Sequence, residues 1–414
     1  MPGSVAPLET VVVPVHFRCP ISLELMRDPV TVCSGQTYDR TSIEPWLASA
    51  DNPTCPVTRL PLADTTLIPN HTLRRLIQEW CVAHRSDGVD RIPTPKQPAD
   101  PSLVSSLVQS LQPPSSDAVV SSSLRRLKTL ALDSDKNRAL ISQNPNLRSS
   151  LVSLLFTSSS DPSADAISDT LALISFFPLS VADSEAISAR PDRLTAVSAL
   201  LRHSSPDVRV GAASLVENLA VSPESRSALG DTPGIIAGVV AVLRPPTSSH
   251  PRAARAGAKA LLALCLARPN RDAAAAEGAA GALVDLLASA GADRRDAERA
   301  LATLELLCRT RGGCEALLGH ALAVPLLVKA VLRVSERATE SAAGALLALC
   351  RASEARQRDA VGAGAVTQLL LLVQSDCTER AKRKAQLLLK LLLSAWPDHP
   401  APNSDLGFSD LLAI

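Results

Sequence analysis

Aromatic residues are scarce in this chain of 414 residues: they make up 2% of it, with one tyrosine and three tryptophans. Leucine, alanine and valine must therefore build the core. This favours close-packed helices over a β-sandwich, because strands are enriched in β-branched and aromatic residues. The formal net charge is only +1. Without a global excess of charge, the composition gives no indication of a nucleic-acid partner or an anionic membrane surface.

Long apolar runs are absent as well. A bilayer-spanning helix needs roughly 18–20 apolar residues, and the longest run, Ile235–Leu243, is about half that length. We therefore predict no transmembrane segment. Residues 1–15 lack a basic region, and Glu9 interrupts their weak apolar stretch, so we predict no signal peptide. The nine scattered cysteines then indicate reduced thiols and a cytoplasmic location, with the nucleus or the membrane periphery as alternatives.

The segment 17–59 is rich in short motifs. Two stretches of the pattern Cys-Pro-apolar-hydroxyl, beginning at Cys19 and Cys55, flank a short predicted helix that carries Trp46. Residues 41–44 fit a capping box for that helix. Farther on, Asn70 is placed to cap a second helix. The apolar residues of this second helix follow helical spacing, at Leu73, Leu76, Ile77, Trp80 and Cys81.

The order of these motifs resembles the U-box, the zinc-free relative of the RING domain of ubiquitin-protein ligases. The resemblance rests on Cys19-Pro20-Ile21, residues 25–30, Ser34-Gly35-X-Thr37-Tyr38-Asp39-Arg40, Ile43 with Trp46-Leu47, Cys55-Pro56-Val57-Thr58 and Leu67-Ile68-Pro69-Asn70. It implies a small α+β, RING-like domain over residues 14–85, after a loose lead-in at 1–13.

A zinc RING would need paired ligands, since tetrahedral zinc takes four sulfur or nitrogen donors. The residues three positions after Cys19 and Cys55 are Ser22 and Thr58, so no Cys-X-X-Cys pair closes. We predict no metal and no cofactor. The resemblance implies that hydrogen bonds and salt bridges replace the metal, and the polar residues placed to make them are Ser22, Glu24, Asp28, Asp39, Arg40 and Thr58. For each of these, an ordinary solvated surface position is the alternative.

The resemblance also implies a docking surface. Five residues match the positions with which U-boxes bind a ubiquitin-conjugating enzyme (E2): Ile21 and Leu23 on the first loop, Trp46 on the helix, and Pro56 and Val57 on the second loop. A small apolar patch of this kind supports modest, reversible binding. The alternative is that the two residues of the first loop belong to the core.

Arg59 matches the family position whose guanidinium bridges the E2 and its bound ubiquitin, which implies catalysis by positioning. An internal salt bridge to a carboxylate of the U-box is the alternative. A catalytic cysteine needs an activating histidine or a basic setting. Since the sequence offers neither for Cys19 or Cys55, we predict a RING-type ubiquitin transferase without a covalent enzyme–ubiquitin intermediate.

Beyond residue 85 the chain changes character. Residues 86–102 hold four prolines and no apolar period, which predicts a linker. Over 103–396 one apolar position recurs at the end of Leu/Ala-rich helices, with spacings of 43, 46, 45, 43, 42 and 42 residues: Ala131, Ile174, Ala220, Cys265, Cys308, Cys350 and Leu392. A helical period of about 40–47 residues is typical of armadillo and HEAT arrays. We expect the three cysteines at this position to be core thiols.

This pattern resembles the armadillo repeat, most closely at Asn218-Leu219-Ala220. Small-residue turns precede a further helix in three copies, at 278–287, 321–332 and 362–373. A long coiled coil is excluded because 43, 45 and 46 are not multiples of seven and because prolines interrupt the helices. The predicted fold class is therefore mostly α: a U-box followed by an armadillo-type α-solenoid, with a loose tail at 397–414.

Together the two resemblances imply a plant U-box/armadillo E3 ubiquitin-protein ligase. Its partners would be an E2, ubiquitin and a protein substrate recruited by the solenoid, with a homodimer formed through the U-box and a role in stress or immune signalling. The alternatives are a non-catalytic adaptor, a zinc RING ligase, and a pure scaffold or transport receptor. The basic run at 380–384 is open between a nuclear signal, a contact with acidic lipids and the polar face of a terminal helix.

Overall fold

The computed structural model describes residues 13–48, 54–85, 99–113, 115–156, 163–244, 250–289 and 293–394. The chain divides into two compact units, Met1–Gln97 and Pro98–Ile414. Nearly all of the expected lead-in at 1–13, most of the expected linker at 86–102 and the whole expected tail at 397–414 lie outside the described residues.

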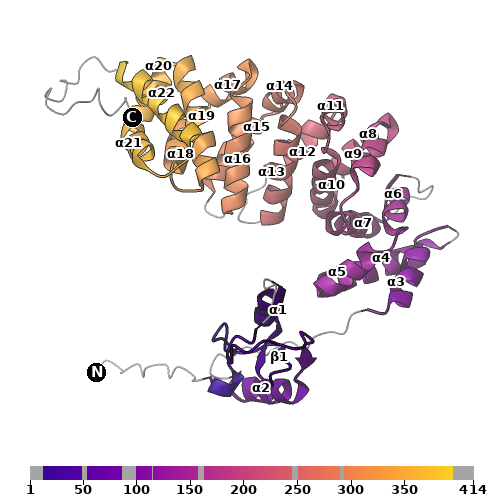
Figure 1. Cartoon of the computed structure of the whole chain (residues 1–414). Coiled ribbons are helices and arrows are strands. Elements are labelled where there is room, and N and C mark those ends of the chain that lie inside the picture. The colour runs from indigo at the N-terminus through magenta and orange to yellow at the C-terminus, as the bar shows by residue number, and fades with distance from the viewer. Residues whose placement is uncertain are drawn as a thin grey trace, which may run out of the picture. The chain divides into compact units, whose positions relative to one another are not determined.

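The N-terminal unit is a small α+β domain built on a three-stranded antiparallel sheet of order β2-β1-β3. Val30 of β1 lies opposite Tyr38 of β2 and Pro69 of β3. Figure 1 shows α1 and α2 at opposite ends of this unit, with β1 between them. The elements are η1 (Val15–Phe17), β1 (Pro29–Thr31), β2 (Thr37–Asp39), α1 (Arg40–Ala48), β3 (Ile68–Pro69) and α2 (His71–Ala83).

One apolar core joins the sheet to both helices of this unit, with Val30, Tyr38, Ile43 and Ile77 fully buried. The predicted cap of α2 is confirmed, since the side-chain oxygen of Asn70 accepts a hydrogen bond from the backbone N–H three residues on, at 3.0 Å.

The expected capping box at residues 41–44 is wrong. Strand pairing continues through Asp39, so α1 begins at the next residue, Arg40. Thr41 therefore lies inside the helix, and its hydroxyl donates to the carboxylate of Asp39 at 3.4 Å.

The C-terminal unit is an α-solenoid. Its described helices are α3 (Pro101–Gln109), α4 (Asp117–Asp133), α5 (Asp135–Ser142), α6 (Leu147–Phe156), α7 (Ala164–Phe176), α8 (Val181–Ser188), α9 (Pro191–Leu201), α10 (Pro206–Leu219), α11 (Pro223–Asp231), α12 (Ile235–Leu243), α13 (Pro251–Cys265), α14 (Pro269–Ala276), α15 (Ala279–Ala288), α16 (Arg294–Leu307), α17 (Arg311–Leu318), α18 (Ala323–Ala330), α19 (Glu336–Ala352), α20 (Glu354–Gly362), α21 (Ala365–Gln374) and α22 (Glu379–Ser394).

The recurring apolar position falls at the end of every third helix. These helices, α4, α7, α10, α13, α16, α19 and α22, form what we call the third-helix row, and each packs against the next. Figure 1 shows the later members of the row side by side. Six of the seven recurring residues are buried, and Cys308 is half-buried. The predicted α-solenoid with a period of about 42–46 residues is thus confirmed.

Glycine with a positive φ angle begins the second helix of several repeats. Gly234 (φ 85°), Gly278 (φ 82°) and Gly364 (φ 83°) directly precede α12, α15 and α21. Only glycine adopts this backbone conformation without steric cost. Two of the three predicted small-residue turns, at 278–287 and 362–373, thus depend on a glycine, whereas Leu322 precedes the helix of the third with φ −84°.

No single helix within the described ranges has both the length and the apolar character needed to cross a bilayer. Two strongly bent helix pairs, α11 with α12 and α17 with α18, meet that length and composition only when taken jointly.

Candidate functional site

Two loops of the N-terminal unit share one hydrogen-bond pattern. The carbonyl of Cys19 accepts the N–H of Leu23 at 2.8 Å, and the carbonyl of Cys55 accepts the N–H of Arg59 at 2.7 Å. Each cysteine N–H also donates to the carbonyl five residues on, at 2.8 and 2.9 Å. The repeated Cys-Pro-apolar-hydroxyl sequence thus folds twice into the same tight turn.

The fifth residue of each turn has a left-handed backbone. Leu23 has φ 61° and Arg59 has φ 58°, which costs a non-glycine residue about 1–3 kcal/mol. The backbone hydrogen bonds on both sides hold this geometry. Both side chains consequently project outward, and Leu23 is 70% exposed. Strain of this kind, retained at the tips of two matching loops, points to a role in binding.

Strand β2 anchors both loops through their buried cysteines. The backbone N–H of Asp39 donates to Cys19 Sγ at 3.3 Å. One residue earlier, the hydroxyl of Tyr38 lies 3.0 Å from Cys55 Sγ, and that sulfur also accepts the hydroxyl of Ser34 at 3.2 Å. Because α1 begins directly after β2, the first loop, the second loop and α1 are all held in one rigid frame.

Hydrogen bonding sets the ionisation of these thiols. Burial by itself raises the pKa of Cys55, but hydrogen bonds from Ser34 and Thr58 outweigh it and lower the pKa to about 6. The pKa of Cys19 is lowered in the same way, by backbone N–H groups that offset its burial. Burial raises the pKa of Tyr38, so its hydroxyl stays neutral and can donate. The two sulfurs therefore act as acceptors that hold the loops.

An ion-pair cluster ties the remaining elements together. Asp28 pairs with Arg40 Nε at 2.7 Å and with Arg74 at 3.2 Å, which links the residue before β1 to both helices. Arg40 also reaches Glu44 at 3.5 Å. The cluster is partly buried, so its charges are screened less than those of a surface pair.

The other polar residues predicted for this network make hydrogen bonds outside the ion-pair cluster. The carboxylate of Asp39 accepts the N–H of Arg27 at 2.8 Å. The hydroxyls of Ser22 and Thr58 each accept the N–H two residues on, at 3.4 and 3.5 Å. Glu24, two residues after Ser22, forms its hydrogen bonds through its backbone N–H and carbonyl. The predicted set is thus divided between contacts across the domain, made by Asp28, Asp39 and Arg40, and two local turns, made by Ser22 and Thr58.

Sequence reasoning missed several members of this polar framework. Ser34, Tyr38 and the two cysteines carry the sulfur-centred bonds, and the repeated Cys-Pro motif is the signal that marks the cysteines. Arg74 lies 46 residues from its partner Asp28, and no local motif announces it. In the described part of the chain, no three His, Cys, Asp or Glu side chains gather as metal ligands would.

The predicted docking residues lie on the two loops and on α1. Val57 is 50% exposed and Trp46 is 44% exposed, whereas Ile21 and Pro56 are half-buried. Trp46 Nε1 donates to the carbonyl of Thr54 at 2.9 Å, which ties α1 to the start of the second loop.

Leu60, which is 63% exposed, extends the apolar surface of the second loop and was not predicted. The first loop is divided between the two readings that the sequence left open. Ile21 packs against the core, and Leu23 does not.

Arg59 is exposed beside these apolar residues. Its guanidinium has no ion-pair or hydrogen-bond partner among the described residues, so the internal salt bridge weighed above is not observed there. A free guanidinium on a rigid turn offers five donors in a fixed plane to an incoming partner.

The solenoid holds the remaining residues singled out from the sequence. Burial raises the pKa of Cys265, Cys308 and Cys350 to about 12 in each case, as expected of unreactive core thiols. Asn218 is half-buried, and its carbonyl accepts the hydroxyl of Ser184 at 3.1 Å. The basic run at 380–384 lies on α22, the last described helix, where Lys384 pairs with carboxylates of α16 and α19.

Comparison with known proteins agrees with this architecture. Residues 13–86 match the profile of the U-box domain, and residues 103–409 match that of the plant U-box protein ARM repeat region. U-box domain-containing protein 26 of Arabidopsis thaliana is 53% identical over 98% of both chains. E3 ubiquitin-protein ligase PUB23 of the same plant is 32% identical over 95% of both chains.

One solved structure superposes on this chain with a TM-score of 0.57. It is described as showing a phosphorylation switch that controls the interaction between cadherin and β-catenin. The superposition covers 80% of this chain and 59% of the solved chain. Because the two sequences are only 16% identical, the likeness concerns the fold alone. The two matched profiles cover most of the chain, and the relatives match along nearly their whole length. This chain therefore belongs to the plant U-box proteins with an armadillo-repeat region, a family whose members include E3 ubiquitin-protein ligases.

Proposed function

We propose that this protein is a RING-type E3 ubiquitin-protein ligase that binds a ubiquitin-charged E2 and promotes direct transfer to a substrate lysine. The observation that carries the proposal is the rigid frame around β2, which displays exposed apolar side chains and an arginine with no partner among the described residues, all from the two loops and α1. The docking residues are Ile21, Leu23, Trp46, Pro56 and Val57.

In this mechanism the chain supplies no nucleophile. The substrate amine attacks the thioester carbon held by the E2, forms the isopeptide bond, and releases the E2 thiol. Cys19 and Cys55 are fully buried, which fits their exclusion from this chemistry. Arg59 donates hydrogen bonds to carbonyls of both the E2 and ubiquitin and so favours the reactive arrangement of a flexible conjugate, an effect of orientation.

The solenoid recruits the protein substrate in this proposal, because stacked helical repeats present an extended surface to peptides. Family membership supports three further proposals: a homodimer through the U-box, a role in plant stress or immune signalling, and a cytoplasmic location with the nucleus or membrane periphery as alternatives. Imaging of a fluorescent fusion in plant cells tests the location.

Self-ubiquitination tests the ligase proposal. The purified full chain is mixed with activating enzyme, E2, ubiquitin and ATP, and wild type is compared with Trp46→Ala, Arg59→Ala and the distant surface variant Arg75→Ala. We expect high-mass conjugates with wild type and Arg75→Ala. Trp46→Ala should lose E2 binding, whereas Arg59→Ala should keep E2 binding and lose most transfer.

The eight lysines begin at Lys96, so conjugates must form outside the U-box. Within the described residues, Lys136, Lys329 and Lys390 are exposed and should be modified first. A wild type that is inactive with a broad panel of E2 enzymes would favour the non-catalytic adaptor instead. One zinc or more per purified chain would favour the zinc RING.

A further inference from the structure

Three successive helices of the third-helix row carry an arginine at the same position of the repeat. Arg252 of α13, Arg295 of α16 and Arg337 of α19 lie 43 and 42 residues apart, and each is the second residue of its helix. All three are exposed. Acidic residues lie one repeat away on either side: Asp207 in α10 is 45 residues before Arg252, and Glu379 in α22 is 42 residues after Arg337. We call Arg252, Arg295 and Arg337 the arginine ladder.

The arginines of the ladder take no part in the ion pairs that join one repeat to the next. Across the part of the chain that the structure describes, none of the three guanidinium groups makes an ion pair or a hydrogen bond. Neighbouring charges instead join one repeat to another: Lys128 with Asp169 at 2.7 Å, Lys259 with Glu217 at 3.3 Å, Arg255 with Asp293 at 2.9 Å, and Lys384 with Glu305 at 2.8 Å.

Two members of the ladder line a cavity of about 530 Å³ formed by α13, α16 and α19. Arg295 and Arg337 share its wall with two carboxylates that are already engaged. Glu298 accepts the hydroxyl of Ser335 at 3.0 Å, and Glu340 pairs with Lys384 at 3.4 Å. Because the Ser335 hydroxyl is neutral, Glu298 keeps its charge, but the lining holds three arginines against two glutamates and its net charge is therefore positive.

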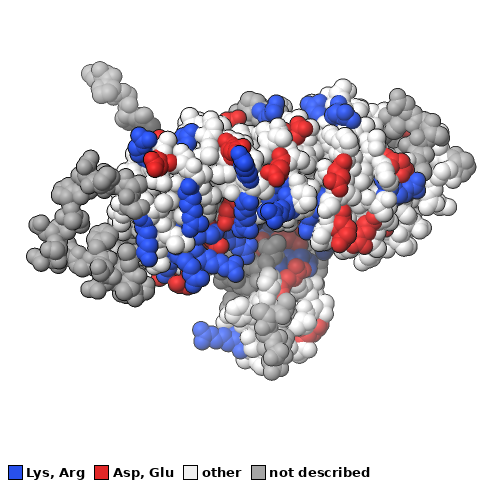
Figure 2. Space-filling view, turned by 90° about the horizontal axis from the view of Figure 1, so that it is seen from above, with Lys and Arg blue, Asp and Glu red and all other residues white. Residues whose placement is uncertain are grey.

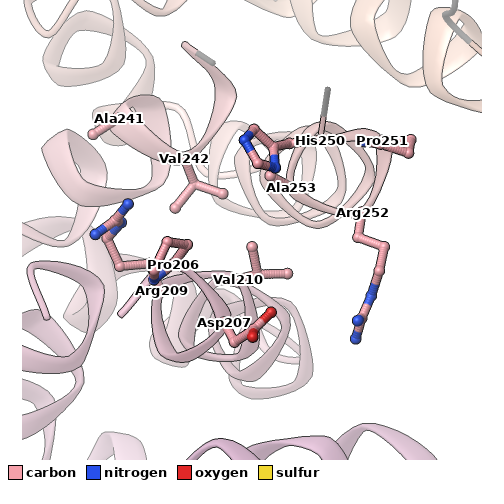
Figure 3. Close-up of a pocket in the computed structure, with 10 residues that line it drawn as sticks. All are labelled: Pro206, Asp207, Arg209, Val210, Ala241, Val242, His250, Pro251, Arg252 and Ala253. Carbon is pink, nitrogen blue, oxygen red and sulfur yellow. The ribbon is translucent and has the colours of Figure 1, made fainter. Parts of the chain in front are cut away.

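The third member, Arg252, borders a neighbouring cavity of about 240 Å³ between α10, α12 and α13. Figure 3 shows Arg252 and His250 on the α13 side and Asp207 and Arg209 on the α10 side. Figure 2 shows Lys and Arg side chains gathered along one edge of the C-terminal half of the solenoid. The surface thus has a basic stretch three repeats long, bounded by Asp207 at its N-terminal end.

We propose that the arginine ladder binds an extended acidic segment of a protein substrate. This inference rests on the proposed ligase function, because it assigns the chemistry of the substrate that the solenoid recruits. Packed helices lie about 8–10 Å apart, and an extended chain in the polyproline II conformation advances about 3.1 Å per residue with three residues per turn, so that every third side chain lies on one face. Acidic side chains about three residues apart would therefore meet successive arginines, and each planar guanidinium can hold a carboxylate through two hydrogen bonds.

Fluorescence anisotropy with the full chain tests this assignment. The probe is a fluorescein-labelled, Gly/Ser-based peptide of twelve residues with glutamate at every third position, and the control peptide has glutamine at the same positions. The ladder variant is Arg252→Gln/Arg295→Gln/Arg337→Gln. The matched control variant, Arg268→Gln/Arg351→Gln/Arg358→Gln, removes the same charge from exposed arginines outside the ladder.

We expect the ladder variant to bind the glutamate peptide at least about tenfold more weakly than wild type, since three exposed charge contacts of about 0.5 kcal/mol each give that ratio. The control variant should stay within about twofold, and wild-type affinity should fall as salt rises. Unchanged thermal melting of both variants shows that the fold is retained.

Three results would overturn the assignment: equal binding of the glutamine peptide, equal weakening in the control variant, or tighter ladder-dependent binding of single-stranded RNA or phosphatidylserine vesicles. Self-ubiquitination of the same preparations keeps the two proposals apart. Ligase activity that survives while peptide binding fails would sink only the ladder. Peptide binding by a chain that is inactive with every E2 would sink only the ligase.

Discussion

The U-box and the solenoid of this protein are stabilised in different ways. The U-box joins its loops and helices through a few polar contacts between residues far apart in sequence, such as Asp28 with Arg74 and Tyr38 with Cys55. The solenoid repeats one apolar contact between neighbouring helices, six times along the seven helices of the third-helix row. A single polar substitution should therefore disturb the whole U-box, whereas damage to one repeat is shared mainly with its neighbours.

The largest effect is expected from a cavity in the solenoid. Leu304 of α16 is fully buried in the third-helix row, and Leu304→Ala should lower the free energy of unfolding by about 2–5 kcal/mol. Thermal unfolding followed by circular dichroism measures it. Leu332→Ala, at an exposed leucine, is the control. If the two units are as distinct as their packing indicates, E2 binding by Leu304→Ala stays at the wild-type level.

A smaller effect is expected from the ion-pair cluster of the U-box. Asp28→Asn removes the carboxylate that joins Arg40 to Arg74 and should cost about 1–3 kcal/mol. Limited proteolysis of the full chain should then digest the destabilised U-box while the solenoid stays intact. Asp64→Asn removes an exposed carboxylate and should change nothing. Equal protease resistance of Asp28→Asn and wild type would contradict the structural importance of this cluster.

The corners of the solenoid give a third comparison. Gly234 has φ 85°, and an added Cβ would lie 2.7 Å from the hydroxyl oxygen of Ser198, so Gly234→Ala should destabilise the solenoid by about 1–2 kcal/mol. Gly362 ends α20 with no atom near the position of a Cβ, and Gly362→Ala should be neutral or slightly stabilising. Chemical denaturation of both variants measures the difference, and equal midpoints would argue against the strained corner.

The last comparison concerns pH, because the pKa shifts of the buried thiols have opposite signs in the two units. The pKa of Cys55 is about 6 in the folded U-box against an ordinary thiol value of 9.0. Between pH 6 and 9 the unfolded state therefore binds more protons, and U-box stability should rise with pH over that window. The contribution of the Cys55 thiolate to U-box stability should be fully present above pH 9 and lost as the pH falls to 6.

The solenoid thiols should behave in the opposite way. Burial raises the pKa of Cys265 and Cys350 to about 12, so above pH 9 the unfolded solenoid releases protons that the folded one retains. The contribution of these thiols to the stability of the solenoid should be constant from pH 6 to 9 and should fall above pH 9. Melting curves of wild type and Cys55→Ser across pH 6–10 test both signs, and a pH slope that survives in Cys55→Ser would assign the effect to another group.

Much of the fold was predictable because its signals are local. The period of 42–46 residues located every member of the third-helix row, and the asparagine at position 70 correctly marked the start of α2. The capping box at 41–44 failed because strand pairing, which is not local, carried β2 up to Asp39. Leu76 fits the helical period of α2 and is nevertheless 46% exposed, since periodicity reports a face and not what covers it.

The sequence by itself determined that the chain has two parts with different sequence patterns. One part is a helical repeat, and in the other two Cys-Pro loops flank a short helix. Tertiary structure decided which charges are used internally and which are left free. Arg59 and Arg74 have the same chemistry, yet one is exposed on a strained turn and the other pairs with Asp28. The same holds for Arg337 and Arg299, because an ion pair requires two groups within a few ångströms, and sequence spacing does not specify that distance.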